Sequence, residues 1–349
     1  MSVLDRGDLR VRVQQALDAF LDDHEPRLLA MGAELAPFND AVRDFLAGGK
    51  RLRPGFCFWG HLGAGGKDSD GLVELAASLE LFQAAAIVHD DVMDGSDTRR
   101  GKPAVHRRFE ALHRAANWHG SPEQFGAGGA ILLGDLCLSW SEEMLVGSGL
   151  LNADARRVFD TMRAELMAGQ YLDLLEQASG AGTVEGALRV ARYKSAKYTI
   201  VEPLHLGGTT AGASPEVLAA YTDFGLPLGI AFQLRDDLLG VFGDPAVTGK
   251  PAGDDLREGK RTVLVALALE RASEQQTTLV RRHLGDPDLD SPGVEALRSV
   301  LVDTGAVDEL ESLIERNTAE ALSALTDVIT PEAAEVLRAL ALEATRRTT

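Results

Sequence analysis

Apolar residues recur at three- and four-residue spacing along most of the chain, and this period limits the fold more than any other feature. Residues at that spacing share one face of a helix. Two clear stripes of this kind consist of Leu9, Val13, Leu17, Phe20 and Leu21, and of Leu310, Leu313, Ile314, Leu322, Leu325, Val328 and Ile329. The alternation of apolar and polar residues that marks a half-buried strand is absent from the sequence. The chain is therefore predicted to be all-α.

Clusters of Gly, Pro, Ser and Asp predict loops between helices at 63–71, 119–129, 178–183 and 243–255. The glycine-rich stretches lack the GxxxxGK[ST] spacing of a nucleotide-binding loop, so we interpret them as turns. Neither a fixed-period repeat nor a clear linker divides the sequence. Although 349 residues exceed the usual size of one domain, we expect a single large helical domain over residues 1–349.

The chain is acidic, with 35 Lys and Arg against 53 Asp and Glu and a formal net charge of -18. Such a chain repels phosphate backbones, so nucleic acid is not expected as a partner. The N-terminal stretch lacks the apolar core of a secretory signal, and no uncharged apolar run reaches the roughly 18 residues of a membrane span. Cys57 and Cys137 show no disulfide-framework or zinc-site spacing. We therefore expect a cytoplasmic protein without a membrane span.

The segment HDDVMD at 89–94 ends an apolar helix with acidic residues. Asp90 and Asp94 are four residues apart, so both carboxylates project from one helical face, about 6 Å apart along the axis. A solvated helix end is the alternative, but carboxylates there oppose the helix dipole unless a cation offsets them. Magnesium suits this arrangement, because one or two carboxylates and substrate phosphates complete its shell. A calcium EF-hand does not, since Val92 and Gly101 would stand where oxygen ligands are needed.

The segment FQLRDDLLG at 232–240 repeats the combination of an apolar helix and paired acids. Gln233 lies three residues before Asp236, so an amide and a carboxylate share one helical face. Asp90 and Asp236 are far apart in the sequence and can converge only through the fold. If they converge on facing helices, three cations and a diphosphate fit between the two acidic clusters.

Basic residues accompany both acidic segments. They are Lys50, Arg51 and Arg53 in GGKRLRP, Arg99 and Arg100 after the first cluster, and Lys250 and Lys260 after the second. Any one of them alone is more simply a solubilising surface residue. Arginine matches phosphate oxygens with two parallel hydrogen bonds, and lysine supplies a point charge. Acids for a metal beside bases for an anion together indicate diphosphate chemistry.

Six motifs resemble those of the trans-isoprenyl diphosphate synthase (polyprenyl synthetase) family in order and approximate spacing. They are GGKRLRP, HDDVMD with DTRRGKPAVH, GQYLDL, YKSAKYT, FQLRDDLLGVFGD and GKPAGDDLREGKRT. The resemblance covers about residues 45–262, with C-terminal helices expected at 263–349. It implies a helical bundle around a central cavity, of the isoprenoid synthase type, and a homodimer. Within the family, the chain looks most like a geranylgeranyl diphosphate synthase.

The resemblance also implies roles for individual residues. Magnesium, as three ions, would be held by Asp90 and Asp94 on one side and Asp236 on the other, with Asp91 and Asp237 in supporting positions. The allylic diphosphate would be held by Arg99, Lys194 and Lys250. Isopentenyl diphosphate would be bound by Lys50, Arg53, Arg100 and Gln83. The reacting centre would be lined by Ser195, Gln233 and Lys260.

The reaction that the family pattern implies is a head-to-tail condensation. Metal and basic residues pull diphosphate from the allylic substrate, the isopentenyl double bond attacks the resulting carbocation, and loss of a proton completes the new double bond. The departing diphosphate is the expected proton acceptor. One departure is that Gly240 stands where the third acid of a second DDxxD motif would be. In an unbroken helix Asp244 cannot replace that acid, so the metal site on this side is expected to depend on Asp236 and Asp237.

Product length is expected to depend on residues one turn before Asp90, which face the space for the growing hydrocarbon tail. These residues are Ala85 and Ala86, and in the family bulky side chains there shorten the product. Phe82, a further turn away, is the expected floor of the tunnel. We therefore predict the C20 product geranylgeranyl diphosphate, with farnesyl and longer polyprenyl products as alternatives.

Two other functions compete with chain elongation. A class I terpene cyclase also has a DDxxD motif, but it normally carries an Asn-Ser-Glu type second metal motif, which this sequence lacks. A non-catalytic regulatory subunit would be expected to lose acids from the first cluster, whereas this chain keeps Asp90, Asp91 and Asp94. Elongation is therefore the preferred interpretation.

Overall fold

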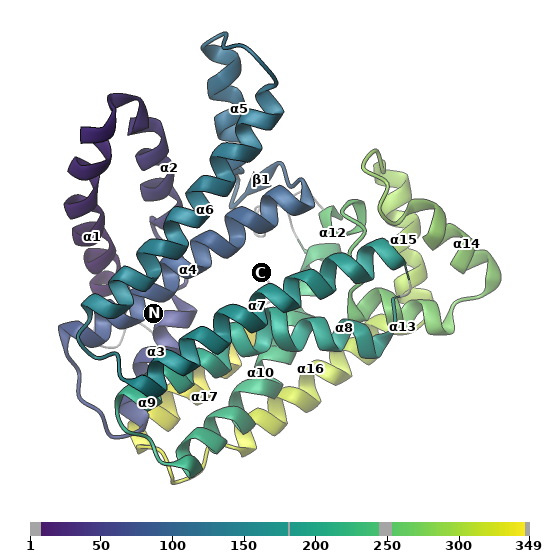
Figure 1. Ribbon diagram of the computed structural model, residues 1–349. Helices are drawn as coiled ribbons and strands as arrows, with labels where there is room; N and C mark the ends of the chain where they lie inside the picture. The colour runs from purple at the N-terminus through teal and green to yellow at the C-terminus, as the bar shows by residue number, and fades with distance from the viewer. Residues whose placement is uncertain (1–7, 181, 244–252, 346–349) are drawn as a thin grey trace. The chain divides into compact units, whose positions relative to one another are not determined.

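The structure is a computed structural model that describes residues 8–180, 182–243 and 253–345 (Figure 1). Within these ranges the regular structure is helical apart from one two-stranded hairpin, which confirms the all-α prediction. The chain divides into two compact units. Unit 1 consists of Met1–Ala155 with Gly207–Gly212, and unit 2 of Arg156–Leu206 with Ala213–Thr349. The expectation of one domain over the whole chain stays a prediction.

Unit 1 contains the N-terminal helices and the hairpin. In chain order its elements are α1 (Leu9–Met31), the short 3₁₀ helix η2 (Ala33–Leu35), α2 (Ala36–Leu46), α3 (Leu52–Gly63), α4 (Asp70–Asp94), β1 (Thr98–Arg99), β2 (Lys102–Pro103), α5 (Val105–Ala115) and α6 (Pro122–Gly147). The strands β1 and β2 pair antiparallel, with Arg99 opposite Lys102. This hairpin follows directly on the first acidic cluster.

Helices α4 and α6 run side by side through unit 1 and form most of its core (Figure 1). The predicted stripe on α1 is confirmed, because Leu9, Val13, Leu17 and Leu21 are all buried and α1 packs on α4. Burial of these side chains drives the packing, since each fully buried large aliphatic residue contributes about 1.5–3 kcal/mol. The acidic end of α4 is therefore fixed to a well-packed helix.

The predicted loop at 119–129 is too long, because α6 already begins at Pro122 after the N-cap Ser121. The glycines that suggested a loop lie inside the helix and let α5 approach it closely. A Cβ atom on Gly126 would lie 2.4 Å from the carbonyl oxygen of His106, and one on Gly129 would lie 2.7 Å from the ring of Phe109. Close helix packing, and not backbone freedom, explains these glycines.

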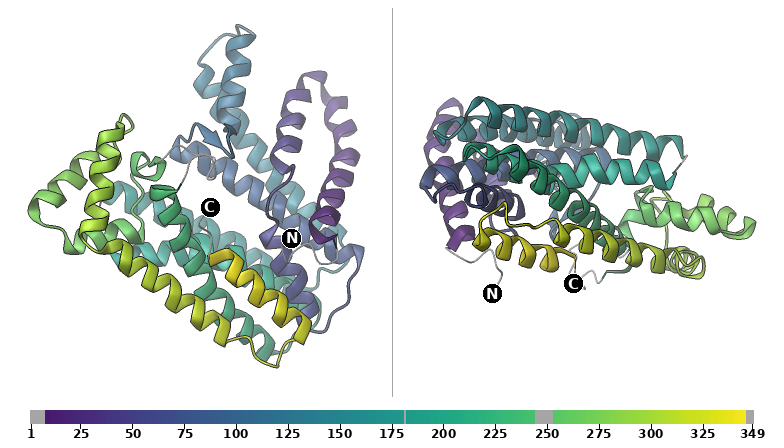
Figure 2. Two further views of the ribbon diagram at one scale, coloured as in Figure 1. Left: turned by 180° about the vertical axis from the view of Figure 1, so that it is seen from behind. Right: turned by 90° about the horizontal axis from the view of Figure 1, so that it is seen from below.

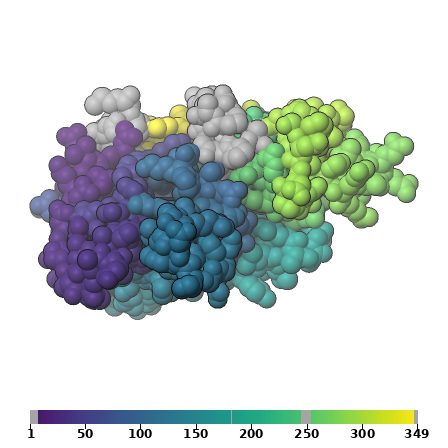
Figure 3. All heavy atoms as spheres, turned by 90° about the horizontal axis from the view of Figure 1, so that it is seen from above, coloured from purple at the N-terminus to yellow at the C-terminus, as the bar shows by residue number. Residues whose placement is uncertain are grey.

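Helix α5 also contacts α2. Phe38 of α2 stacks on Phe109 of α5 with ring centroids 6.0 Å apart, and Arg108 forms an ion pair of 2.6 Å with Asp44. The space-filling view shows atoms of these two helices beside each other (Figure 3). These contacts brace the segment that follows the first acidic cluster.

Unit 2 contains the helices from α7 onward, including a wide π-helix, except that the start of α7 and the end of α9 from Gly207 belong to unit 1. In chain order they are α7 (Ala153–Ser179), α8 (Val184–Val190), the π-helix η3 (Ala191–Val201), α9 (Glu202–Thr210), α10 (Pro215–Phe242), α12 (Asp254–Arg257), α13 (Val263–Arg271), α14 (Glu274–His283), α15 (Ser291–Asp303), α16 (Ala306–Ser323) and α17 (Pro331–Thr345). Helices α16 and α17 run along α10 (Figure 2). The buried apolar face of α16, with those of α13 and α15, forms a core around α10.

The predicted stripe at the C-terminus is correct only in its first part. Leu310 and Ile314 are buried on α16, but the helix ends at Ser323, so Leu325 and Val328 belong to the following turn. Helix α17 begins with Pro331, a favoured first helical residue that disfavours helical backbone at the position before it. The apolar spacing therefore continues beyond the end of α16 into a turn, where it does not mark a helix.

The π-helix η3 packs against two helices at glycine contacts. A Cβ atom on Gly169 of α7 would lie 2.8 Å from the backbone nitrogen of Lys194. One on Gly229 of α10 would lie 2.3 Å from the Cα atom of Ala196. Segments of π-helix are rare and often occur at functional sites. This one carries Lys194 and Ser195.

Replacing Gly229 with Ala is expected to destabilise the protein by about 1–3 kcal/mol, because the methyl group must push η3 away from α10. Denaturant unfolding measures this loss. Gly128→Ala is the matched control, since Gly128 lies inside α6 and a Cβ atom there meets nothing within 4 Å. That change should leave stability equal or raise it by up to about 1 kcal/mol. Equal stability of the two variants would contradict the packing argument.

Among the residues that the structure describes, two helices are long and apolar enough, by length and composition alone, to cross a membrane. They are α4 and α10, whose most apolar windows are 72% and 50% buried inside the structure. Core helices of soluble proteins pass the same test. Both helices also carry the acidic clusters, so we treat them as core helices.

Candidate active site

The first acidic cluster lies on the last two turns of α4, as predicted. The helix ends at Asp94, with Gly95 in the left-handed conformation (φ 66°) as its C-cap. Its last turn, all of which the structure describes, carries no basic residue to complement the negative end of the helix dipole. Asp90 and Asp94 therefore occupy a position that favours a bound cation.

Asp91, between them, has a different environment. Its side chain is fully buried and accepts hydrogen bonds from Nε of Arg99, at 2.9 Å, and from Nη2 of the same residue. Charge-assisted pairs of this kind are stronger than neutral hydrogen bonds. Arg99 thus ties the hairpin to the end of α4, and the role of Asp91 in supporting the metal ligands stays a prediction.

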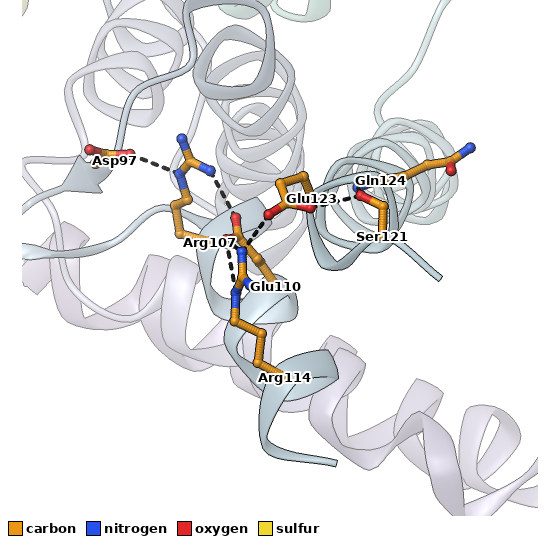
Figure 4. Close-up of polar contacts among 7 residues, drawn as sticks. All are labelled: Asp97, Arg107, Glu110, Arg114, Ser121, Glu123 and Gln124. Atoms are coloured by element: carbon orange, nitrogen blue, oxygen red, sulfur yellow. Dashed lines mark hydrogen bonds and ion pairs between the residues drawn. The ribbon is translucent and has the colours of Figure 1, made fainter. Parts of the chain in front are cut away.

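A polar network extends from the hairpin to the start of α6 (Figure 4). Nε of Arg107 donates to Asp97 at 2.8 Å, and its Nη1 donates to Glu110 at 2.8 Å. Arg114 bonds both Glu110 and Glu123. Sequence reasoning missed these residues, whose function is to hold α5 against the segments on either side.

The basic residues of GGKRLRP divide into two kinds. Arg51, in the left-handed conformation (φ 53°), is buried and pairs with Glu80 of α4. Its Nη2 also donates to Oε1 of Gln14 and to the Leu46 carbonyl, both at 2.6 Å. Arg51 is therefore a structural residue and not a phosphate ligand.

Lys50 and Arg53 flank Arg51 in the sequence. Lys50 is exposed before α3, and the half-buried Arg53 lies in the first turn of that helix. The buried anchor at Arg51 fixes the turn that carries both residues. Gln83, which is also predicted to bind isopentenyl diphosphate, is half-buried in the middle of α4.

Arg100 lies in the hairpin turn with φ 53°, and its guanidinium is 5.7 Å from the ring centroid of Phe45. Its pKa is lowered, first by burial of the guanidinium and then by the positive charges of Arg51, Arg99 and Arg53, whereas Glu80 raises it. Arg51, Arg53 and Arg99 therefore lie within electrostatic reach of Arg100. The structure brings Arg53, Arg99 and Arg100 into one basic cluster in unit 1, as an anion site requires.

The second acidic cluster lies within α10, where Asp236 and Asp237 occupy the last two turns. Asp237 is buried, and its Oδ1 accepts a hydrogen bond of 2.7 Å from Nε2 of Gln233. The Oε1 atom of Gln233 accepts from Ser195 of η3. The structure therefore joins three of the predicted residues of unit 2 in one chain of hydrogen bonds.

Burial raises the pKa of Asp237 to about 8, although the bond from Gln233 lowers it. The negative charges of Asp255 and Asp236 raise it further, and Lys260 lowers it. Carboxylates this close repel one another. A cation at this end of α10 would relieve that repulsion.

The two predicted site lysines of unit 2 that the structure describes, Lys194 and Lys260, both form ion pairs. Nζ of Lys194 lies 2.7 Å from Asp173 of α7, and Nζ of Lys260 lies 2.7 Å from Glu258 and 3.4 Å from Asp255. Asp173 belongs to the GQYLDL motif but was given no role from the sequence. Lys250 lies outside the described residues, as does Asp244.

The donor atoms fit magnesium better than a metal held only by protein. In the ranges that the structure describes, no three Asp, Glu, His or Cys side chains converge as a ready metal site. Magnesium typically takes one or two carboxylates and completes its shell with water and phosphate. The end of α4 suits such an ion, because its carboxylates can bind the metal while the neighbouring basic cluster can bind the phosphate groups that complete the shell. The first cluster belongs to unit 1 and the second to unit 2, and their convergence stays a prediction.

The predicted chain-length residues lie in the middle of α4. Phe82 and Ala85 are buried, and Ala86 is half-buried one turn before Asp90. Residues 83–94 belong to one unbroken helix. Nε2 of His89 lies 3.1 Å from the carbonyl oxygen of Ile131 of α6.

Comparison with known proteins identifies a family. A family model described as polyprenyl synthetase matches residues 36–300. A geranylgeranyl diphosphate synthase of Mycobacterium tuberculosis is 33% identical over 328 residues, which cover 93% of this chain and 87% of the relative. A geranylfarnesyl diphosphate synthase of Aeropyrum pernix is 33% identical over 273 residues, which cover 76% of this chain and 79% of the relative. Relatives of equal identity thus differ in the product that names them.

A solved structure agrees with the family assignment. The crystal structure of a geranylgeranyl pyrophosphate synthase from Corynebacterium glutamicum, complexed with isoprenyl diphosphate and magnesium, is 45% identical to this chain. The TM-score is 0.93, over 97% of this chain and 98% of that chain. This similarity confirms that the fold is that of an all-α isoprenoid synthase.

Proposed function

Because the chain belongs to the polyprenyl synthetase family, we propose that it condenses isopentenyl diphosphate with allylic diphosphates and uses magnesium as its cofactor. It is a prenyltransferase that elongates prenyl chains. The observation that best supports the proposal is in unit 1, where the acidic end of α4 lies beside the cluster of Arg53, Arg99 and Arg100. Acids for a cation and bases for a diphosphate are what this reaction requires.

Each predicted site residue has a proposed role. Asp90, Asp94 and Asp236 bind three magnesium ions, and Asp91 and Asp237 support them. Arg99, Lys194 and Lys250 hold the allylic diphosphate, while Lys50, Arg53, Arg100 and Gln83 hold isopentenyl diphosphate. Ser195, Gln233 and Lys260 line the reacting centre. The ion pairs of Arg99 with Asp91 and of Lys194 with Asp173 support this assignment, because they hold the two basic side chains in place before substrate binds.

The reaction needs charge stabilisation more than a protein base. Magnesium, when bound, neutralises charge that develops on the departing diphosphate. The basic side chains add fixed positive charge at the same group. The bond from the allylic carbon to diphosphate oxygen breaks, a carbon–carbon bond to the isopentenyl unit forms, and the departing diphosphate accepts the released proton.

Incubation of purified protein with isopentenyl diphosphate, magnesium and each of the C5, C10 and C15 allylic partners tests the function. Product sizing should show chains extended by whole isoprene units, and removal of magnesium with EDTA should abolish them. A cyclised hydrocarbon from an allylic substrate alone would instead identify a terpene cyclase. The absence of any product with all three partners would refute the proposal.

For the product we propose geranylgeranyl diphosphate. The small side chains of Ala85 and Ala86 on α4 are expected to admit a tail longer than C15, and Phe82 lies one turn further from the acids. Farnesyl and longer products remain the alternatives.

The variant Ala86→Phe is expected to shift the product to C15 or shorter, because the ring would close the space beside α4. Chromatography of the products measures the shift. Ala115→Phe, at the end of α5, serves as the control and should leave the chain length unchanged. An unchanged product from Ala86→Phe would refute the tunnel assignment.

We also propose a homodimer in the cytoplasm. Phe125, Leu132 and Val146 lie seven or fourteen residues apart on α6, so they share one face, and their exposed fractions are 41%, 63% and 54%. An exposed apolar stripe of this kind is typical of a protein interface. Light scattering should give twice the mass of the chain. A single-chain mass at micromolar concentration would contradict the dimer.

A further inference from the structure

The missing third acid of the second motif leaves a space that another residue fills. Gly240 lies on α10, four residues after Asp236, so the two positions share one helical face. A Cβ atom on Gly240 would lie 1.8 Å from Oδ2 and 2.7 Å from Cγ of Asp255. The carboxyl group of Asp255, on α12, therefore occupies the place where a side chain of residue 240 would begin.

Asp255 is held in this place by its own segment. Its side chain is 15% exposed, and its carbonyl oxygen accepts a hydrogen bond of 3.1 Å from the backbone nitrogen of Lys260. Gly259, with φ 74°, makes the turn between them and approaches the Cα atom of Gly285 closely. Residues 255–260 thus form a compact turn against the end of α10.

The same turn places an ammonium group between two carboxylates. Nζ of Lys260 lies 3.4 Å from Oδ1 of Asp255 and 2.7 Å from Oε2 of Glu258. Its charge reaches Asp237, whose pKa it lowers. A lysine side chain is long and flexible, so the carboxylates of Asp255 and Glu258 greatly restrict the positions that the ammonium group of Lys260 can take.

We propose that Asp255, seated on Gly240, is a positioning residue that holds Lys260 at the acidic end of α10. It takes the place of the third acid of the motif, but comes from a different helix. Gly240 is then required for its lack of a side chain, and a larger residue there would displace Asp255. This inference depends on the proposed function, in which Lys260 lines the reacting centre, and deepens it by assigning the ammonium group of Lys260 to the allylic diphosphate bound there.

Binding of inorganic diphosphate in the presence of magnesium, measured by titration calorimetry, tests the proposal without catalysis. Asp255→Asn keeps the shape of the side chain but removes its charge. It should weaken diphosphate binding about tenfold, because loss of a residue that orients a ligand-binding group typically weakens binding by at least that factor. Gly240→Ala should weaken it similarly by displacing the carboxyl group. Asp254→Asn, the neighbouring acid on α12, is the matched control and should bind as the parent does.

Combined variants distinguish positioning from general damage. If Asp255 acts through Lys260, Asp255→Asn should have no further effect on diphosphate binding in a Lys260→Gln background. The double variant Gly240→Ala with Asp255→Asn should bind no more weakly than either single variant. Effects of Asp255→Asn and Lys260→Gln that multiply, or an Asp255→Asn protein that binds as the parent does, would overturn the proposal.

The outcome also separates this inference from the function it depends on. In catalysis, Asp255→Asn should raise the KM for the allylic diphosphate and leave that for isopentenyl diphosphate unchanged. A parent protein that binds diphosphate but makes no prenyl product would refute the proposed function. A parent protein that makes prenyl products while Asp255→Asn keeps both KM values would refute only the role of Asp255.

Discussion

The variant Asp94→Asn is expected to lower kcat for chain elongation by about 100- to 1,000-fold, the usual effect of removing one group that stabilises transition-state charge. The reason lies in the end of α4, where Asp90 and Asp94 share one face and the last turn offers no basic residue to balance them. An amide keeps the size of the side chain but loses the charge that attracts magnesium. The KM for isopentenyl diphosphate should change little, since its proposed ligands are other residues.

Glu74→Gln is the matched control for this experiment, because it removes one carboxylate from an exposed position on the same helix. It should leave kcat unchanged. Calorimetric titration with magnesium and diphosphate should show weaker binding only for Asp94→Asn. If both variants keep full activity, the cluster on α4 does not bind the cation and the proposed mechanism is wrong.

The fold was largely predictable because helical periodicity is a local property. The stripe on α1 and the apolar helix that ends in the acids of HDDVMD needed only the local sequence pattern. The start of α6 was not predictable in the same way. Gly126 and Gly129 are local signals for a turn, whereas their real function depends on contact with α5, which no local pattern reveals.

In the candidate site, too, local patterns were predictable and contacts between distant segments were not. Its acids and bases were visible as motifs, but the partners that position them were not. Asp173 beside Lys194, and Asp255 beside Lys260, are ordinary acids in the sequence and gain a role only where the fold places them within 3.4 Å of a lysine. Arg51 is the opposite case, since its motif suggests an anion ligand and its burial shows a structural residue.

That burial leads to the largest expected effect on stability. The side chains of Arg51 and Glu80 are 3% and 6% exposed, so the remaining charged group cannot be hydrated when its partner is removed. Glu80→Ala should therefore lower the free energy of unfolding by about 3–5 kcal/mol. Denaturant unfolding measures this loss. The exposed pair of Arg27 and Asp23 on α1 provides the control, and Arg27→Ala should have a far smaller effect.

The double variant Arg51→Met with Glu80→Leu distinguishes the contribution of the ion pair from that of the other hydrogen bonds of Arg51. Two apolar side chains leave no unpaired buried charge, so this protein should be more stable than the Glu80→Ala variant. It loses the bonds from Arg51 to Gln14 and Leu46, however, and these fix the turn between Lys50 and Arg53. Its KM for isopentenyl diphosphate should therefore rise even though its stability recovers. Stability that falls further in the double variant would show that those two bonds, and not the ion pair, hold this part of unit 1 together.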